Sequence, residues 1–433
     1  MTSVLAQVLT VVLTSIVIVT SAATKIDRSY CNTAMNTGII PPLPPHATLV
    51  QVHVLHRHGS RTKGGVDQQE AWLGESKVMY NCTSELLEGP DATVSPSGAV
   101  LFNKVYEPGR NELNGNCMTG QLVADGLLMC QASGRNLAKA YKNFLPSTPL
   151  DPADFYLRSD DVPRTLASGQ GLFAAMYPDH EAVVPWHTMD VGSDAETMVP
   201  NPKVCPSLID AASRALTHFE ASEHYQHVSI PLASELSTAL NRTITPNEIA
   251  GLLDPLMSVQ CSTVPSIGGD PPAALNKNLQ DRMIEESGYK LYYACNDTDV
   301  AKFGAGPLLG EILVKMEVVN AKEIRAPKLV IWSGHDTGPM APVIGALRVG
   351  GAEFPRFNEL LAIEMYDTSS SGTMIRIIHN GAVVTGLVPG CPQNSDLCPW
   401  KLFHDTVMRL VPTPSDCGRE DSPAWWPVPT LQE

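Results

Sequence analysis

Histidine and arginine side chains gather in the stretch VLHRHGSR, residues 54–61, directly after an apolar run. A neutral imidazole at His58 could attack phosphorus and carry the phosphoryl group as phosphohistidine, which divides one difficult displacement into two easier ones. Arg57 and Arg61 supply planar guanidinium groups that match the oxygens of a phosphate. These residue types at this spacing predict a phosphate site that contains its own nucleophile.

Two later segments contain the groups that such a site still needs. The segment RSDDVPRT, 158–165, contributes Arg164, and LVIWSGHDTG, 329–338, contributes His335 and Asp336. Arg164 and a protonated His335 would stabilise negative charge on the transferred phosphoryl group. Asp336 is placed to protonate the leaving alkoxide, and an unperturbed carboxyl pKa of about 3.9 favours turnover at acidic pH.

These segments can meet only if a sheet brings their ends together. The stretches ATLVQVHVLHRHG (47–59) and KLVIWSG (328–334) are apolar until their last residues, where ionisable groups stand beside a glycine. This pattern predicts parallel strands whose carboxyl ends share one edge of a sheet. Other apolar periodicities predict a short strand from 154, strands at 182–189, 360–367 and 374–381, and helices at 120–144, from 165, at 306–320 and at 340–347.

The order of these elements predicts an α/β fold with a mixed, mostly parallel sheet flanked by helices, and with an inserted, mainly helical cap domain. The predicted divisions are a signal peptide at 1–23, an α/β core formed by 24–199 and 323–433, and the cap at 200–322. A chain of 433 residues with 43% hydrophobic content can bury a core of this kind. We expect the active site where the cap faces the edge of the sheet.

Taken in order, RHGSR, RSDDVPRT and SGHDT resemble the signatures of the histidine acid phosphatases, the branch of the histidine phosphatase superfamily with RHGxRxP early and HD late. The resemblance covers about residues 49–417. It implies an acid phosphatase that needs no metal or other cofactor, with His58 as nucleophile and Asp336 as proton donor. It implies as phosphate ligands Arg57, Arg61, Arg164 and His335. It also implies the disulfides Cys391–Cys398 and Cys205–Cys417, and leaves the other six cysteines unassigned.

One position departs from the family pattern, because Lys63 stands where the family has a proline. The loop that leaves the phosphate site should therefore be more flexible and carry an extra cation, which leaves the entrance geometry and the substrate preference open. The first alternative is a phytase-type inositol-phosphate phosphatase, which shares the same signatures. The second is an ectodomain that binds phosphate without catalysis.

The N-terminal segment, the cysteines and the glycosylation sequons together indicate the compartment. Residues 4–19 are apolar and lead into small residues at 21–23, which predicts a secretory signal cut near Ala23, with an uncleaved signal anchor as the alternative. Ten cysteines are an even set that favours disulfides over metal ligands, and sequons stand at Asn81, Asn241 and Asn296. The sequence predicts a secreted, endolysosomal or cell-surface glycoprotein.

The formal net charge of −15 argues against an extended nucleic-acid footprint or an anionic membrane surface. The expected partner is a small-molecule phosphomonoester. A membrane is expected to matter only if the N-terminal segment stays uncleaved, and a homodimer is left possible.

The neighbouring basic residues have structural interpretations of their own. Strand alternation sends His53 to the opposite face from His56 and His58, which argues against a histidine metal site and predicts a hydrogen-bonded core residue at His53. His56 is expected either to support His58 or to fill space, and His187 has a smaller chance of touching the site. For Arg158 we favour an ion pair with Asp160 or Asp161 over phosphate contact.

Overall fold

The computed structural model describes residues 31, 40–64, 70–82, 85–88, 101–104, 113–145, 150–178, 184–190, 192–262, 269–322, 325–350, 353–369 and 371–419. The predicted signal peptide, 1–23, lies outside these residues. None of the helices described there combines the length and the apolar character that a membrane crossing requires.

The core of the described chain is an eight-stranded mixed sheet in which β1 occupies a central place. Strands β1, β8, β6 and β7 run parallel to one another, whereas on the other side of β1 strand β9 pairs antiparallel with β1 and with β10. The order is β11 (Ala382–Val383), β10 (Gly372–His379), β9 (Leu360–Thr368), β1 (Ala47–Arg57), β8 (Leu329–Gly334), β6 (Phe155–Ser159) and β7 (Trp186–His187), while β12 (Cys398–Pro399) pairs with β10.

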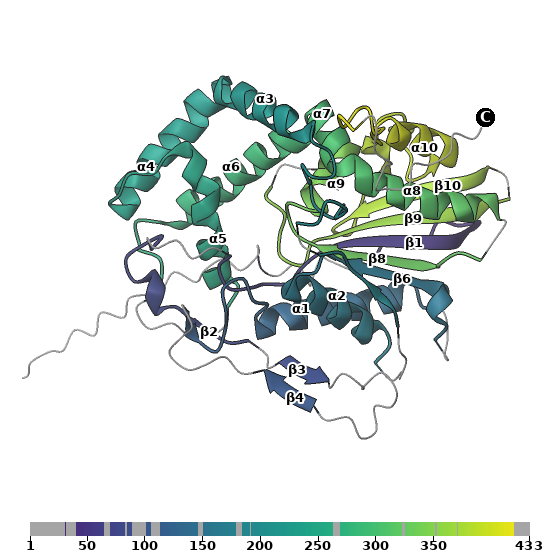
Figure 1. Cartoon of the computed structure of the whole chain (residues 1–433), viewed down its shortest axis with the longest axis horizontal. Helices are drawn as coiled ribbons and strands as arrows, with labels where there is room; N and C mark the ends of the chain where they lie inside the picture. Colours follow the sequence, from purple (N-terminus) through teal and green to yellow (C-terminus); the bar gives the residue numbers. More distant parts are fainter. Residues whose placement is uncertain are drawn as a thin grey trace, which may run out of the picture.

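Helices cover both faces of this sheet (Figure 1). On one face α1 (Ala124–Ala140) and α2 (Pro163–Met176) pack over Val54 and Ile331, and on the other α8 (Gly306–Ala321), α9 (Met340–Leu347) and α10 (Trp400–Met408) pack over Leu55 and Trp332. Neighbouring residues of β1 thus enter different cores, which is why both of its faces are apolar. The predicted fold class, a mixed sheet flanked by helices, is confirmed.

A second group of helices lies beside the sheet and has its own apolar core (Figure 1). Helices α4 (Ile230–Leu240) and α5 (Ile249–Gln260) and the first half of α6 (Lys277–Cys295) form this core, and α3 (Leu208–Glu220), η5 (Tyr225–Ser229) and η6 (Pro246–Glu248) adjoin them. The end of α6 and η7 (Ala301–Ala305), which follows α7 (Thr298–Val300), pack in the core on the sheet. The division into a core and a cap at 200–322 stays a prediction. Helix α8, which falls inside that range, packs on the sheet rather than among the cap helices.

Smaller elements complete the described chain. Two short pairings join β2 (Met79–Tyr80) to β5 (Asn114–Gly115) and β3 (Glu85–Glu88) to β4 (Leu101–Lys104). Single turns of 3-10 helix occur at η3 (Glu75–Lys77), η4 (Pro152–Asp154) and η8 (Thr385–Leu387). The strand predicted at 182–189 is reduced to the two residues of β7, with 181–183 outside the described residues.

The described residues form four disulfides, of which two join segments more than 200 residues apart. The two pairs implied by the family resemblance, Cys391–Cys398 and Cys205–Cys417, are both confirmed. The remaining bonds are Cys31–Cys261, which joins the N-terminal segment to the end of α5, and Cys82–Cys117. Cys130 and Cys295 are buried free thiols.

Candidate active site

The backbone of His58 is held at the point where β1 ends. Its N–H donates to the Gly334 carbonyl at the end of β8, at 2.8 Å, and its own carbonyl accepts from the Asn358 N–H at 3.0 Å. The next residue, Gly59, crosses α1 so closely that a Cβ there would lie 2.2 Å from the Gly126 carbonyl oxygen. The parallel pairing of β1 with β8 and this close crossing therefore fix where the imidazole stands.

The imidazole of His58 is neutral, and its hydrogen bond settles the tautomer. Nδ1 lies 2.8 Å from the Gly59 carbonyl oxygen, and because a carbonyl can only accept, Nδ1 must carry the proton. Burial, followed by the charges of Arg57, His335, Arg164 and Arg61, holds the pKa of His58 well below its usual value of 6.5. The lone pair on Nε2 is therefore available for nucleophilic attack.

The three predicted arginines surround this imidazole, and the terminal nitrogens of each guanidinium make hydrogen bonds or ion pairs with other residues. Arg57 Nη2 lies 2.9 Å from Asp336 Oδ2, Nη1 donates to the Pro355 carbonyl, and the guanidinium lies over the Phe357 ring at 4.4 Å. Arg61 Nη2 lies 2.7 Å from Asp254 Oδ1. These contacts set the orientation of two planar groups before any substrate arrives.

Arg164 is held less firmly at the start of α2. Its Nη1 donates to the Gly120 carbonyl at 3.4 Å, and its Nη2 lies 3.5 Å from His335 Nδ1. Burial and the charges of Arg61 and Arg57 lower the pKa of Arg164 to about 10 against the opposite effect of Asp160 and Asp336, so the group stays a cation under acidic and neutral conditions.

One feature is common to all three arginines: the Nε of each is buried and has no hydrogen-bond partner among the described residues. A buried donor without an acceptor is costly, so an unsatisfied N–H on each of three neighbouring cations calls for a ligand with several acceptor oxygens. Among the residues that the structure describes, no group of three or more His, Cys, Asp or Glu is arranged to hold a metal ion. The arrangement suits a tetrahedral oxyanion.

His335 and Asp336 follow β8 and face the same place. The rings of His58 and His335 meet edge to face with their centroids 5.3 Å apart. Burial alone would raise the pKa of Asp336, but Arg57, Arg61 and His335 together hold it below its usual 3.8. The expectation of an unperturbed carboxyl is therefore wrong, because the cations predicted to bind phosphate also stabilise the carboxylate.

Asp160 is a member of the site that the sequence interpretation missed. Its Oδ2 accepts a hydrogen bond from His335 Nε2 at 2.7 Å, and the carboxylate is buried. This bond fixes the ring so that Nδ1 faces Arg164. The signal was present in RSDDVPRT, where Asp160 stands four residues before Arg164 on one loop, but there it was interpreted as a partner for Arg158.

Arg158 lies elsewhere and has different partners. Its guanidinium pairs with Glu196 at 3.1 Å and with Glu311, and donates to the Thr197 hydroxyl at 3.1 Å. The predicted ion pair with Asp160 or Asp161 is therefore wrong, although a structural role for Arg158 was expected. The error arose because both carboxylates that it contacts are distant in sequence.

Three further histidines lie on β1 and β7, and each contacts another side chain. His56 Nε2 lies 2.7 Å from Asn358 Oδ1, and the Asn358 backbone N–H donates to the His58 carbonyl, so His56 is linked to His58 through Asn358. His53 is a hydrogen-bonded core residue as predicted, with Gln51 Oε1 at 2.9 Å. His187 is exposed and stacks on Tyr156, with ring centroids 4.4 Å apart.

Lys63 does not supply a free cation at the entrance. Its Nζ lies 2.5 Å from Glu75 Oε1, and the Glu75 side chain is buried. The expected extra positive charge is thus neutralised. The following loop is held from the cap, because the Gly64 N–H donates to Asp254 Oδ2 at 2.6 Å. Asp254 is a second residue that the sequence interpretation missed, since nothing in the helical segment LLDPL distinguishes it.

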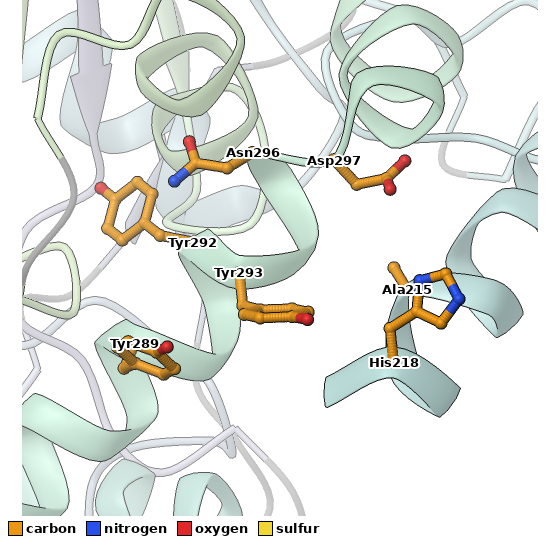
Figure 2. A pocket seen from close by; sticks show the side chains of 7 residues that line it. All are labelled: Ala215, His218, Tyr289, Tyr292, Tyr293, Asn296 and Asp297. Atoms are coloured by element: carbon orange, nitrogen blue, oxygen red, sulfur yellow. The ribbon is translucent and has the colours of Figure 1, made fainter. Parts of the chain in front are cut away.

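A separate hollow of about 340 Å³ lies in the cap between α3 and α6, as Figure 2 shows. None of the six predicted site residues lines it. Its walls are Ala215, His218, Tyr289, Tyr292, Tyr293, Asn296 and Asp297.

Comparison with known proteins agrees with this geometry. The sequence model of the histidine phosphatase superfamily (branch 2) matches residues 48–380. Counting factor 60 of Dictyostelium discoideum is 26% identical over 389 residues, covering 85% of this chain and 88% of that protein. The lysosomal acid phosphatase of Rattus norvegicus is 24% identical over 313 residues, covering 68% and 70%. The Klebsiella sp ASR1 phytase structure has a TM-score of 0.59 at 16% identity, covering 90% of this chain and 100% of that one.

Proposed function

Because this chain belongs to branch 2 of the histidine phosphatase superfamily, we propose that it is an acid phosphatase that hydrolyses phosphomonoesters through a phosphohistidine at His58. The observation that carries the proposal is the set of three unpartnered Nε donors, on Arg57, Arg61 and Arg164, around a neutral imidazole. Those donors would bind the phosphate oxygens and leave phosphorus open to His58 Nε2.

In the first step His58 Nε2 attacks phosphorus, the P–N bond forms, and the bond from phosphorus to the alcohol oxygen breaks. The departing alkoxide takes a proton from Asp336, which becomes a carboxylate. Arg57, Arg61, Arg164 and His335 stabilise the charge that spreads over the phosphoryl oxygens.

In the second step a water molecule attacks the phosphohistidine. Asp336 accepts a proton from that water, the P–N bond breaks, and inorganic phosphate leaves with His58 neutral again. The Nδ1–H bond to the Gly59 carbonyl holds the ring in one tautomer throughout, so the same Nε2 serves both steps.

Replacement of His58 tests the proposal directly. His58→Ala should lose phosphate release at acidic pH by at least about a thousandfold, because no other group replaces the nucleophile. His218→Ala, an exposed histidine on α3, is the matched control and should stay active. Wild-type protein quenched during turnover should carry an acid-labile, base-stable phosphohistidine. A fully active His58→Ala protein would refute the mechanism, and absence of phosphate release from wild type would favour the non-catalytic ectodomain.

A phytase-type activity is the second candidate, since solved structures with this fold are phytases, including that of Klebsiella sp ASR1. That likeness concerns the fold. Hydrolysis of inositol hexakisphosphate and of a simple aryl phosphate, measured side by side, separates the two functions.

For the site of action we propose the secretory pathway, ending in secretion, at the cell surface or in an endolysosomal compartment. Four disulfides suit an oxidising compartment, and relatives include a lysosomal acid phosphatase. Two of the three sequon asparagines, Asn81 and Asn241, are exposed. If glycosidase treatment left the mass of the native protein unchanged, glycosylation would be contradicted.

A further inference from the structure

A carboxylate from the cap stands over the outer side of the proposed phosphate site. Asp254 lies on α5, and its two oxygens contact Arg61 Nη2 at 2.7 Å and the Gly64 N–H at 2.6 Å. The Asp254 side chain keeps 27% of its surface exposed, whereas that of Arg61 keeps 11%. Asp254 is therefore the more outward member of the pair, on the side from which solvent reaches the guanidinium.

The cations around this entrance each have a nearby carboxylate. Arg57 is paired with Asp336 and Lys63 with Glu75, and Asp160 holds the His335 ring that Arg164 also contacts. Arg61 is paired with Asp254 in the same way. Three of the four basic side chains thus contact a carboxylate directly, and the fourth, Arg164, is linked to one through His335. The three unpartnered arginine Nε donors are buried, so the unsatisfied hydrogen-bonding capacity lies deep in the site.

This distribution favours one phosphate and disfavours several. A single phosphoryl group can take the buried Nε donors and add its charge beside three arginines. Every further phosphate on the same molecule would lie outside those donors, near the partly exposed carboxylate of Asp254. A phosphate and a carboxylate that lie close together repel each other, and a specific site often rejects a competitor by such a repulsive element.

We propose that Asp254 is a specificity-determining residue that makes the site select esters with one phosphate over polyphosphorylated esters. The proposal rests on the phosphatase function proposed above and names the substrate class of that site. The proposed role depends on the negative charge of Asp254. A variant that removes only this charge therefore distinguishes the proposed role from one in which Asp254 merely holds the loop in place.

The test compares kcat/KM for inositol hexakisphosphate with kcat/KM for p-nitrophenyl phosphate, at acidic pH and low ionic strength. Asp254→Asn removes the charge and keeps an oxygen that can accept from the Gly64 N–H. We expect the ratio of the two values to rise roughly tenfold in favour of the hexakisphosphate. Asp254→Glu keeps the charge and should keep the wild-type preference. Asp281→Asn on α6, which removes one exposed carboxylate paired with Lys277, is the matched control and should leave the ratio unchanged.

Salt gives a second reading that needs no variant. If Asp254 repels additional phosphates, screening should raise the wild-type ratio for the hexakisphosphate as NaCl is added. A ratio that falls with salt, or that Asp254→Asn leaves unchanged, overturns the specificity role while p-nitrophenyl phosphate hydrolysis still supports the phosphatase. Hydrolysis of neither substrate by wild type would overturn the proposed function, and the specificity role with it.

Discussion

Asp336 Oδ2 lies 2.9 Å from Arg57 Nη2, so the group proposed to donate a proton starts the cycle as a carboxylate. Burial opposes ionisation, but Arg57, Arg61 and His335 together hold the pKa of Asp336 below 3.8. A bound phosphate adds negative charge beside these cations and so raises the proton affinity of the carboxylate. We infer that the proton reaches Asp336 with substrate binding, as when the ester binds as its monoanion.

Substitution of Asp336 should therefore affect substrates according to their leaving groups. Asp336→Asn cannot donate a proton, so alkyl phosphates, whose alkoxides are poor leaving groups, should lose about 10²–10⁴-fold in kcat. p-Nitrophenyl phosphate should lose much less in the first step, because p-nitrophenolate leaves without protonation.

The same variant lacks the base for the second step, so phosphohistidine should accumulate with p-nitrophenyl phosphate. A rapid burst of p-nitrophenol followed by slow turnover would report this, measured by stopped-flow absorbance. Equal losses on aryl and alkyl esters, with no burst, would assign Asp336 another role.

Asp160 should act as a positioning residue for His335. Asp160→Asn keeps a hydrogen-bond acceptor near His335 Nε2 but removes the negative charge beside the ring. We expect kcat to fall roughly tenfold to a hundredfold with little change in KM, because the negative charge that orients the His335 ring against the transferred phosphoryl group is gone.

Asp161→Asn is the control for that experiment, because Asp161 is exposed on the same loop. Asp160→Glu should recover part of the rate if the charge matters. A rise in KM as large as the fall in kcat, or an equal loss in Asp160→Glu, would reduce Asp160 to a structural role.

Two buried histidines predict how stability depends on pH. Burial lowers the pKa of His53 to about 3 and that of His56 to about 4, both from 6.5. The unfolded chain therefore binds protons that the folded chain excludes, so stability falls as pH drops below 6.5 toward these values. Between pH 6.5 and 4.5 this linkage amounts to roughly 2 kcal/mol for one such group.

Urea unfolding at pH 6.5 and pH 4.5 measures this loss. His53→Gln replaces one titrating ring with a neutral side chain and should flatten the dependence by about that amount, whatever its effect on stability at pH 6.5. His218→Gln, on the exposed face of α3, should leave the slope unchanged. An equally steep loss in His53→Gln would show that other groups govern acid stability.

Much of the frame could be predicted because local patterns encode it. The apolar runs that end in HRHG and SGHD identified β1 and β8, and the parallel register that pairs Arg57 with Gly334 brings their ends together as expected. Helix α9 has the predicted bounds. These elements depend on residues that are close in sequence, so periodicity and position at a strand end were sufficient.

Contacts between distant segments could not be predicted in the same way. Asp254 reaches Arg61 only because α5 folds back over the loop after β1, and Glu196 and Glu311 reach Arg158 from two further segments. A carboxylate on a helix carries no local sign of its partner. The sequence could therefore indicate that the arginines needed anions, while the identity of the protein carboxylates required the fold.

The pairing of β1 with β8 also has a consequence for biosynthesis. The ribosome completes β1, which His58 follows, long before it begins β8, after which Asp336 stands. Because β8 pairs with both β1 and β6, a nascent chain that still lacks β8 contains His58 and the three arginines without Asp336. We therefore expect phosphatase activity to appear only after β8 has joined the sheet, so the onset of activity would report a late stage of folding.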